Sequence, residues 1–307
     1  MPDPSDDRRR SPVGPDDVVT LPDISIRQLE YLVAIDEAPT WAAAAQRVGV
    51  SASALSQGLA ELERRLGIGL FEAEGRRRRL RPTARPALDH ARDVVALTAD
   101  LTRWADRVRT ARSGRVRLGL VDVSAVVHHP DVVRDFRTDR PEVELVLSVA
   151  PSSDLLDGLR RGDLDLVVCV EPPTPTTGIE LEHLLSEPLR VLAPPGTTIG
   201  PPATWGPWVL FPRGSHTRRS ITDHLTAVGA PIEIAAESHQ PDVLHEMVAL
   251  GLGWTVLPGP DRKGRDGPPV ASGPRLLDRR LVLARRTGSI HDPAADELAD
   301  RLRAGSP

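Results

Sequence analysis

The 307-residue chain lacks several features that define whole classes of protein. It has one cysteine, Cys169, which excludes a disulfide within the chain and a zinc site built from cysteines. Aromatic residues make up only 3%, and Lys263 is the only lysine beside 38 arginines. No stretch approaches about 18 unbroken apolar residues, so a transmembrane helix is excluded. The hydrophobic fraction of 40% is ordinary, and the length predicts two or three folded domains.

Residues 1–23 also lack the apolar core that an export signal needs. They hold three arginines, six aspartates and five prolines. We therefore expect a disordered extension on a cytoplasmic protein. A single cysteine is consistent with a reducing compartment.

The net charge of −4 hides an uneven distribution. Residues 24–85 hold ten basic and seven acidic side chains, net +3, whereas residues 1–23 are net −3. Within the basic segment, residues 64–85 hold eight arginines and two glutamates, net +6. Phosphate binding depends on such local charge, so this segment is a candidate for binding nucleic acid.

The basic segment has the pattern of a helix-turn-helix. Ser25, Thr40 and Ser51 each precede a run with helical periodicity and are predicted helix caps. Pro39 ends the first helix and Gly49 ends the second after two turns. Two short helices joined by a glycine-containing turn have the spacing of a helix-turn-helix.

The third predicted helix offers a face suited to DNA. Small or hydrogen-bonding side chains lie opposite its leucines, and Gln57 can pair with an adenine edge. Gly58 costs about 1 kcal/mol in mid-helix, which close approach to DNA or to a neighbouring helix would explain. The predicted DNA contacts on the helices are Thr40, Ser51, Ala52, Ser53, Ser56 and Gln57.

A predicted hairpin follows, beginning at Ile68 and turning near Gly75. Four consecutive arginines come directly after the turn. Beside a helix-turn-helix, we interpret this hairpin as a wing that grips the phosphate backbone, although a solvated charge run is the alternative. The predicted phosphate contacts are Arg76, Arg77, Arg78 and Arg79.

Together, these residues of the basic segment resemble the LysR-type transcriptional regulators. The resemblance runs for about sixty residues without a gap and is carried by Ile26–Leu29, Ala44–Ser51, Ala54–Ser56, Leu62-Glu63, Leu66-Gly67 and Leu70-Phe71. It implies an α/β protein with an N-terminal winged helix-turn-helix, a long dimerising linker helix, and a two-lobed effector domain resembling type 2 periplasmic binding proteins.

The chain departs from this family pattern at four places. Ala52-Ser53 replaces the usual Gln-Pro pair, and Gln57-Gly58 replaces the usual Arg-Gln. Ala73 stands where an arginine is usual, and Leu80–Ala84 is a degraded form of Leu-Thr-x-x-Gly. These changes remove familiar base and phosphate readers, so the resemblance does not define the operator. The extra arginines of the wing would compensate.

A long helix is predicted from Thr83, its expected cap, to Arg112, with Pro86 in the first turn. Near 28 residues, it would extend about 40 Å. Its expected buried stripe is Leu88, Ala91, Val95, Thr98, Leu101 or Thr102, Ala105 and Val108. Such a helix usually buries its stripe on a partner chain, which predicts a homodimer, and we expect a homotetramer, although the sequence does not decide between dimer and tetramer. The alternative is packing on its own domain.

From Arg115 onward, strands and helices alternate, which predicts an open α/β sheet with helices on its faces. Strands are expected at 116–120, 143–149, 164–170 and 281–283, and helices at 126–137, at 155–161 capped by Ser152 or Ser153, and from Pro293. The proline-rich segments 171–177 and 261–274 are expected to cross between two lobes.

These patterns divide the chain into five expected parts. They are a disordered extension (1–23), a winged helix-turn-helix (24–85), a linker helix (86–112), effector lobe I (115–177 with 273–307) and effector lobe II (178–272).

Three loops are expected to converge on the cleft between the lobes, beyond the carboxyl ends of strands. The candidate effector contacts are Asp122, Ser124, Ser152, Ser153, Arg213, Ser215 and His216. The serines could instead serve only as helix caps. Arg213 suits an anionic effector and Asp122 a cationic one. Cys169 lies in a predicted buried strand and is interpreted as a core residue.

We therefore predict a cytoplasmic transcriptional regulator, not an enzyme. Its predicted partners are double-stranded DNA, a small-molecule effector and further copies of the chain, with no membrane, cofactor or metal. The alternative is a small-molecule-binding protein or enzyme that uses the two-lobed domain without DNA. The sequence has no nucleophile elbow, phosphate-binding loop or His/Glu zinc motif to favour catalysis.

Overall fold

The computed structural model describes residues 23–74, 77–110, 114–259, 269–290 and 292–306. The chain forms two compact units, Met1–Arg92 and Asp93–Pro307, each of which is described by itself. The expected N-terminal extension lies outside the described residues except for Asp23. No described helix is long and apolar enough to cross a membrane.

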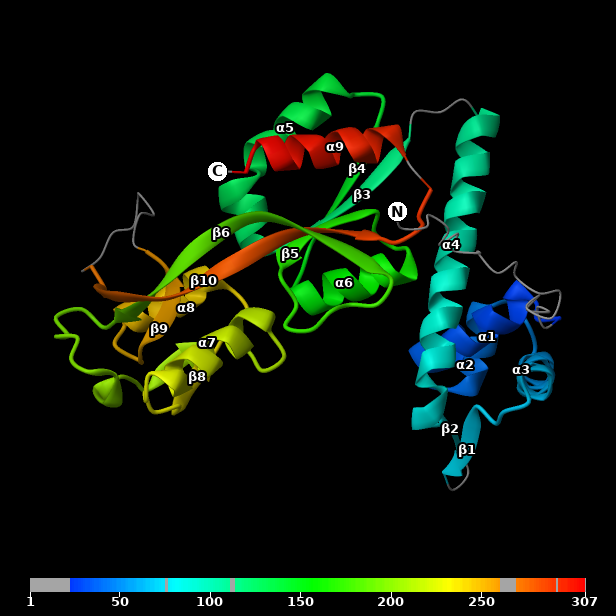
Figure 1. Ribbon diagram of the computed structural model, residues 1–307, viewed down its shortest axis with the longest axis horizontal. Coiled ribbons are helices and arrows are strands. Elements are labelled where there is room, and N and C mark those ends of the chain that lie inside the picture. The colour runs from blue at the N-terminus through cyan, green and yellow to red at the C-terminus, as the bar shows by residue number, and fades with distance from the viewer. Residues whose placement is uncertain (1–22, 75–76, 111–113, 260–268, 291, 307) are drawn as a thin grey trace, which may run out of the picture. The chain divides into compact units, whose positions relative to one another are not determined.

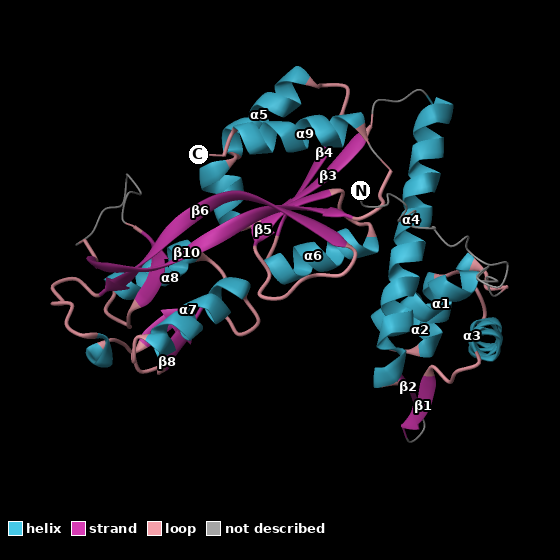
Figure 2. Cartoon of the chain, in the orientation of Figure 1, coloured by secondary structure: helices cyan, strands magenta, loops and turns pink. Residues whose placement is uncertain are grey.

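The first unit is a winged helix-turn-helix (Figure 2). Its elements are α1 (Ile26–Glu37), α2 (Trp41–Arg47), α3 (Ala52–Leu66), the strands β1 (Phe71–Glu74) and β2 (Arg77–Leu80), and the first part of α4 (Arg85–Thr110). The three predicted caps are confirmed: the hydroxyls of Ser25, Thr40 and Ser51 each accept a bond from a first-turn backbone N–H. Thr83 is not a cap, because it lies inside a 3₁₀ turn, Pro82–Ala84.

Apolar faces of all these helices share one core. Leu55, Leu59 and Leu62 of α3 are fully buried, as predicted, and pack with Leu32 of α1. Leu88 of α4 belongs to the same cluster. The first turns of the linker helix are therefore part of the DNA-binding unit.

The mid-helix glycine of α3 is explained by a neighbouring helix. A Cβ on Gly58 would lie 2.7 Å from a ring carbon of Tyr31 in α1, which is too close for any side chain. Gly58 therefore allows α1 and α3 to pack closely, and the helix alternative of the sequence prediction is the correct one.

The second unit is built on a six-stranded sheet with the order β4-β3-β5-β10-β6-β9. Its strands are β3 (Arg115–Leu120), β4 (Glu144–Val149), β5 (Leu166–Val170), β6 (Ile179–Ala193), β9 (Thr255–Pro258) and β10 (Ala271–Arg286). Helices α5 (Pro130–Asp139) and α9 (Pro293–Ala304) cover one face of its first half, and α6 (Ser152–Arg161) covers the other (Figure 1).

Three details of lobe I differ from the prediction. The strand expected at 281–283 is part of the much longer β10, because it pairs with β6 along most of its length. The helix expected at 126–137 begins only at Pro130, because a separate π-helical turn, Ser124–His128, precedes it. Neither Ser152 nor Ser153 caps α6, because the helix begins at Ser152 with Pro151 in the cap position.

The long strands β6 and β10 pair antiparallel from Ile179 and Arg286 to Ala193 and Ala271. They run from the core of lobe I into a separate apolar cluster, the core of lobe II. The proline-rich segments expected to cross between the lobes flank this pair, and part of the second lies outside the described residues. A two-stranded ribbon therefore joins the lobes.

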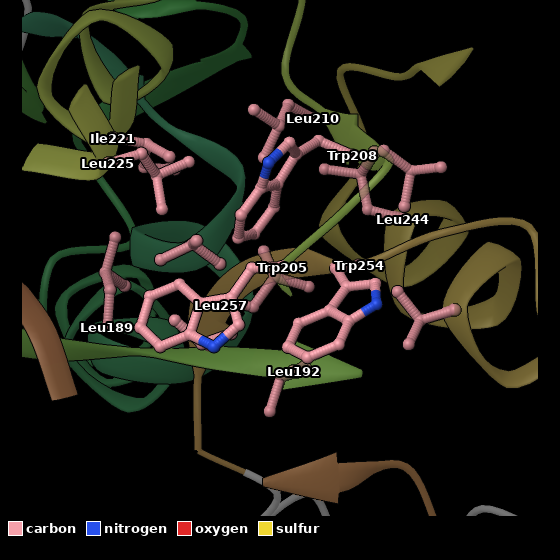
Figure 3. Close-up of a cluster of buried hydrophobic side chains, with 14 of the residues drawn as sticks. Leu189, Leu192, Trp205, Trp208, Leu210, Ile221, Leu225, Leu244, Trp254 and Leu257 are labelled. Atoms are coloured by element: carbon pink, nitrogen blue, oxygen red, sulfur yellow. The ribbon is translucent and has the colours of Figure 1, made fainter. Parts of the chain in front are cut away.

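Lobe II contains β7 (Trp208–Leu210), β8 (Ile234–Glu237), α7 (His216–Ala227) and α8 (Pro241–Ala249). Three tryptophans dominate its core, with Trp254 stacked on Trp205 and edge-on to Trp208 (Figure 3). Each ring buries a large apolar area, so three of the five tryptophans of the chain stabilise this lobe.

Candidate nucleic-acid interface and effector cleft

The exposed face of α3 carries a stripe of polar side chains. Ser53, Gln57 and Arg64 are exposed and lie at spacings of four and seven residues, which places them on one side of the helix. Ala52 is exposed beside them, and Ser56 is half-buried. The structure thus places Ala52, Ser53, Ser56 and Gln57 together on α3, whereas Thr40 caps α2.

Arg64 was missed by the sequence prediction, although its spacing from Gln57 would have identified it. Its Nε donates to Glu61 at 2.8 Å. Hydrogen bonds from Arg64 and then Arg65 lower the pKa of Glu61 to about 2, so this carboxylate stays ionised. Ser51 has a structural role, because its hydroxyl caps α3, and it lies 3.0 Å from the hydroxyl of Ser53.

The wing is a short antiparallel hairpin in which Phe71 faces Leu80 and Ala73 faces Arg78. Arg76 lies outside the described residues, as does the side chain of Arg77. Arg79 approaches Glu72 at 3.8 Å across the two strands. Two of the four predicted arginines are therefore placed, and both are exposed.

A carboxylate fixes the start of the wing. Glu63 of α3 accepts hydrogen bonds from the backbone N–H groups of Leu70, at 2.7 Å, and Phe71, at 3.2 Å. Since charge-assisted bonds of this kind are stronger than neutral ones, the hairpin is anchored on the recognition helix.

In the effector domain, three of the predicted serines have structural partners. The Ser152 hydroxyl accepts from the backbone N–H of Val170 at 3.2 Å, and the Ser215 hydroxyl caps α7. Ser124 is fully buried, and its hydroxyl lies 2.6 Å from Nδ1 of His129. These three serines therefore have structural roles, as the alternative to effector binding predicted, although only Ser215 is a helix cap.

The remaining candidates are more accessible. Ser153 is exposed and donates to the neighbouring Asp154, and Arg213 is exposed. Asp122 is half-buried and, like Arg213, has no hydrogen bond or ion pair with another described residue. Nδ1 of His216, at the start of α7, lies 3.2 Å from the carbonyl oxygen of Val170, so it links lobe II to the end of β5.

A buried charged group lies where β6 and β10 cross between the lobes. Glu187 and Arg279 are opposite each other in the register, and Arg279 donates its Nε to Glu187 at 3.0 Å. Nε2 of His128 lies 3.4 Å from the same carboxylate. Burial raises the pKa of Glu187, but the neighbouring His128 and the guanidinium of Arg279 outweigh it and leave the pKa below its ordinary value. The sequence prediction missed this group.

A second buried ion pair fastens the linker helix to lobe I. The Arg286 guanidinium donates to both carboxylate oxygens of Asp100 in α4 at 2.7 Å, and to the carbonyl oxygens of Leu159 and Leu164. The two side chains are only 5% and 9% exposed. This part of α4 packs on its own chain, which was the alternative prediction.

Two further kinds of site find no support. Among the residues that the structure describes, no group of three His, Cys, Asp or Glu side chains is arranged to hold a metal ion. Cys169 lies within β5, is fully buried as predicted, and burial raises the pKa of its thiol to about 12. Such a thiol stays protonated and unreactive.

Comparisons with known proteins agree on one family. Residues 26–85 match the bacterial regulatory helix-turn-helix protein model of the lysR family, and residues 109–307 match the LysR substrate binding domain. The chain is 29% identical to the HTH-type transcriptional regulator IlvR of Caulobacter vibrioides, covering 91% of this chain and 97% of that protein. It is also 29% identical to a probable hydrogen peroxide-inducible genes activator of Streptomyces viridosporus, covering 91% and 93%.

The fold is shared with solved structures as well. Full-length CbnR in complex with its target DNA aligns with a TM-score of 0.55 and 21% identity, covering 92% of this chain and all of that one. The chain therefore belongs to the LysR family, whose members are DNA-binding transcriptional regulators with an effector-binding domain.

Proposed function

We propose that this regulator reads its operator with the exposed face of α3 and holds the flanking phosphates with the wing. The observation that carries the proposal is the exposed stripe of Ser53, Gln57 and Arg64 on a helix whose opposite face is fully buried. Base edges are read by such side chains, whereas arginines at the rim bind phosphates independently of sequence. The proposed contacts are Thr40, Ser51, Ala52, Ser53, Ser56, Gln57, Arg64, Arg76, Arg77, Arg78 and Arg79.

A gel-shift experiment with the DNA that flanks its own gene tests this division of roles. Gln57→Ala should weaken binding to the preferred site by about 5- to 100-fold and leave binding to random DNA unchanged, because base contacts contribute about 1–3 kcal/mol. Arg160→Ala, at an exposed position of the effector domain, is the matched control and should change neither. Absence of binding at low salt would contradict the proposal.

We infer that a small molecule binds between the lobes, near Asp122, Ser153, Arg213 and His216, and shifts the population of lobe arrangements. Ser124, Ser152 and Ser215, which have structural partners, would hold the backbone around this site in place. A peroxide response through an intrachain disulfide is excluded, although one relative is a probable peroxide-inducible activator, because the chain has a single, fully buried cysteine. A small molecule that binds in the cleft and is recovered chemically unchanged would distinguish a regulator from an enzyme.

We also propose that the linker helix forms a homodimer and that dimers associate into a tetramer. Leu101 and Trp104 of α4 are 53% and 43% exposed, which is unusual for large apolar side chains on one helix. Because it acts on chromosomal DNA, we place the protein in the cytoplasm. We also propose an extension (1–23), a DNA-binding domain (24–85) and a linker (86–112). The expected lobe boundaries at 177/178 and 272/273 move into β6 and β10, because Ile179 and Leu185 pack in the core of lobe I and Leu189 and Leu277 in that of lobe II.

A further inference from the structure

A groove lies beside the wing of the DNA-binding unit. It has a volume of about 900 Å³ and lies between the α1–α2 connection and strand β2. Thr40 and Trp41 line it from the connection, Arg78 and Arg79 from the strand, and Arg85 from the start of α4. Neither Trp41 nor Arg85 was singled out by the sequence.

The charge of the lining is positive. The lining contains three arginines and one carboxylate, that of Asp36. This carboxylate already forms ion pairs with Arg85 at 3.4 Å and with Arg92 at 2.5 Å. One strand of DNA carries a negative charge about every 3.4 Å, so a groove of this kind suits a phosphodiester chain.

One arginine of the groove is held in place by an aromatic ring. The guanidinium carbon of Arg78 lies 5.9 Å from the centroid of the Trp41 ring, within the range of a cation–π interaction. The Trp41 ring in turn meets Phe71 edge-on, with centroids 5.2 Å apart. Phe71 is only 6% exposed, so the core of the unit fixes the orientation of the Trp41 ring.

The other interactions of Arg78 leave its guanidinium available to bind a phosphate. Within the described part of the chain, no carboxylate forms an ion pair with Arg78, in contrast to Arg79, which approaches Glu72. In the hairpin register, Arg78 lies opposite the small Ala73, and the other described residues of this face, Phe71 and Leu80, carry no charge.

We propose that this groove holds the sugar–phosphate backbone of one DNA strand, and that Trp41 is a positioning residue that presents Arg78 to a phosphate. The proposal rests on the proposed DNA-binding function and adds a residue that acts without touching DNA. Because Arg78 is ordered before DNA arrives, less side-chain entropy is lost on binding.

Fluorescence anisotropy with the full chain and a labelled random duplex of about 30 base pairs, over a range of salt, tests the groove. Arg78→Ala should weaken binding and make the slope of log affinity against log salt shallower by about 1. Trp41→Leu should weaken binding by about 2- to 5-fold, the loss expected for an exposed cation–π contact. Arg160→Ala should leave affinity and slope unchanged.

The decisive measurement is the coupling between the two positions. If Trp41 acts through Arg78, Trp41→Leu should cause no further loss once Arg78 is alanine. If the wild-type chain binds DNA but Trp41→Leu weakens binding equally with and without Arg78→Ala, this inference is overturned and the proposed function still stands. Failure of the wild type to bind at low salt overturns both. If Trp41→Leu does not fold, Trp41→Phe serves instead: it keeps an aromatic ring beside Phe71 but weakens the cation–π interaction, so its smaller loss should also disappear once Arg78 is alanine.

Discussion

At the scale of single residues, His129 shows how a long-range contact sets local chemistry. The imidazole is fully buried, with Nδ1 2.6 Å from the hydroxyl of Ser124 and Nε2 3.1 Å from that of Ser306. A neutral ring offers one donor and one acceptor, so both serines can be satisfied. Burial, and secondarily the nearby charge of His128, lowers the pKa of His129 to about 4.

This histidine should make the effector domain sensitive to acid. Between pH 6.5 and about 4 the unfolded chain binds a proton that the folded chain does not, so stability falls as the pH falls through this window. The contribution is at most about 3.5 kcal/mol, since one pKa unit corresponds to about 1.4 kcal/mol. Urea unfolding of His129→Asn should show a smaller loss between pH 7 and pH 4.5 than the wild type.

The matched control is His183→Asn, which replaces an exposed histidine bonded to Ser186. It should follow the wild type at every pH. An equal acid sensitivity of His129→Asn and the wild type would show that other groups cause the loss.

At the scale of elements, features that depend on residues close in the sequence were predicted well. Features that depend on contacts between distant residues were not. The caps at Ser25, Thr40 and Ser51 are confirmed because each bond spans three residues of sequence. The start of α5 was wrong, because the π-helical turn before it is held by His129, whose partner Ser306 is 177 residues away. No periodicity in a window of residues contains that constraint.

The same limit applies to the candidate sites. The polar face of α3 could be predicted, because helical spacing alone defines it. The pairs Glu187–Arg279 and Asp100–Arg286 could not, because their members are separated by 92 and 186 residues. The effector loops are predicted from strand order, but only the structure reveals that Ser124, Ser152 and Ser215 have structural partners.

The second part of α4 should detach from lobe I when its ion pair is broken. Asp100→Asn leaves the buried Arg286 guanidinium without a counter-charge, which should lower the free energy of unfolding by about 3–5 kcal/mol. Hydrogen exchange should then accelerate at the backbone amides of residues 93–103. Asp157→Asn, which removes an exposed pair with Arg160, should change stability by less than about 0.5 kcal/mol. Unchanged exchange in Asp100→Asn would refute this role.

At the scale of the whole molecule, charge and apolar surface are distributed by function. The net charge of −4 includes a basic DNA-binding segment, and the exposed apolar side chains of α4 belong to the proposed dimer. Neither property is visible in the composition of the chain, because composition averages over both units.

The dimer should depend on the exposed face of α4. Trp104→Glu and Leu101→Glu should each raise the dimer dissociation constant at least about tenfold, since burying an unpaired carboxylate costs more than 1.4 kcal/mol. Analytical ultracentrifugation measures the change. Leu252→Glu, at an equally exposed position of lobe II, should leave the sedimenting mass unchanged. A wild-type monomer at micromolar concentration would contradict the proposal.

The four bonds of Arg286 have a mechanical consequence. They attach α4 to lobe I at Asp100, and the same helix continues without a break to Arg85, about 22 Å away at 1.5 Å per residue. These bonds would make the part of α4 around Asp100 move together with lobe I. In the proposed function, a change in lobe I on effector binding would therefore reach the linker helix directly, at Asp100.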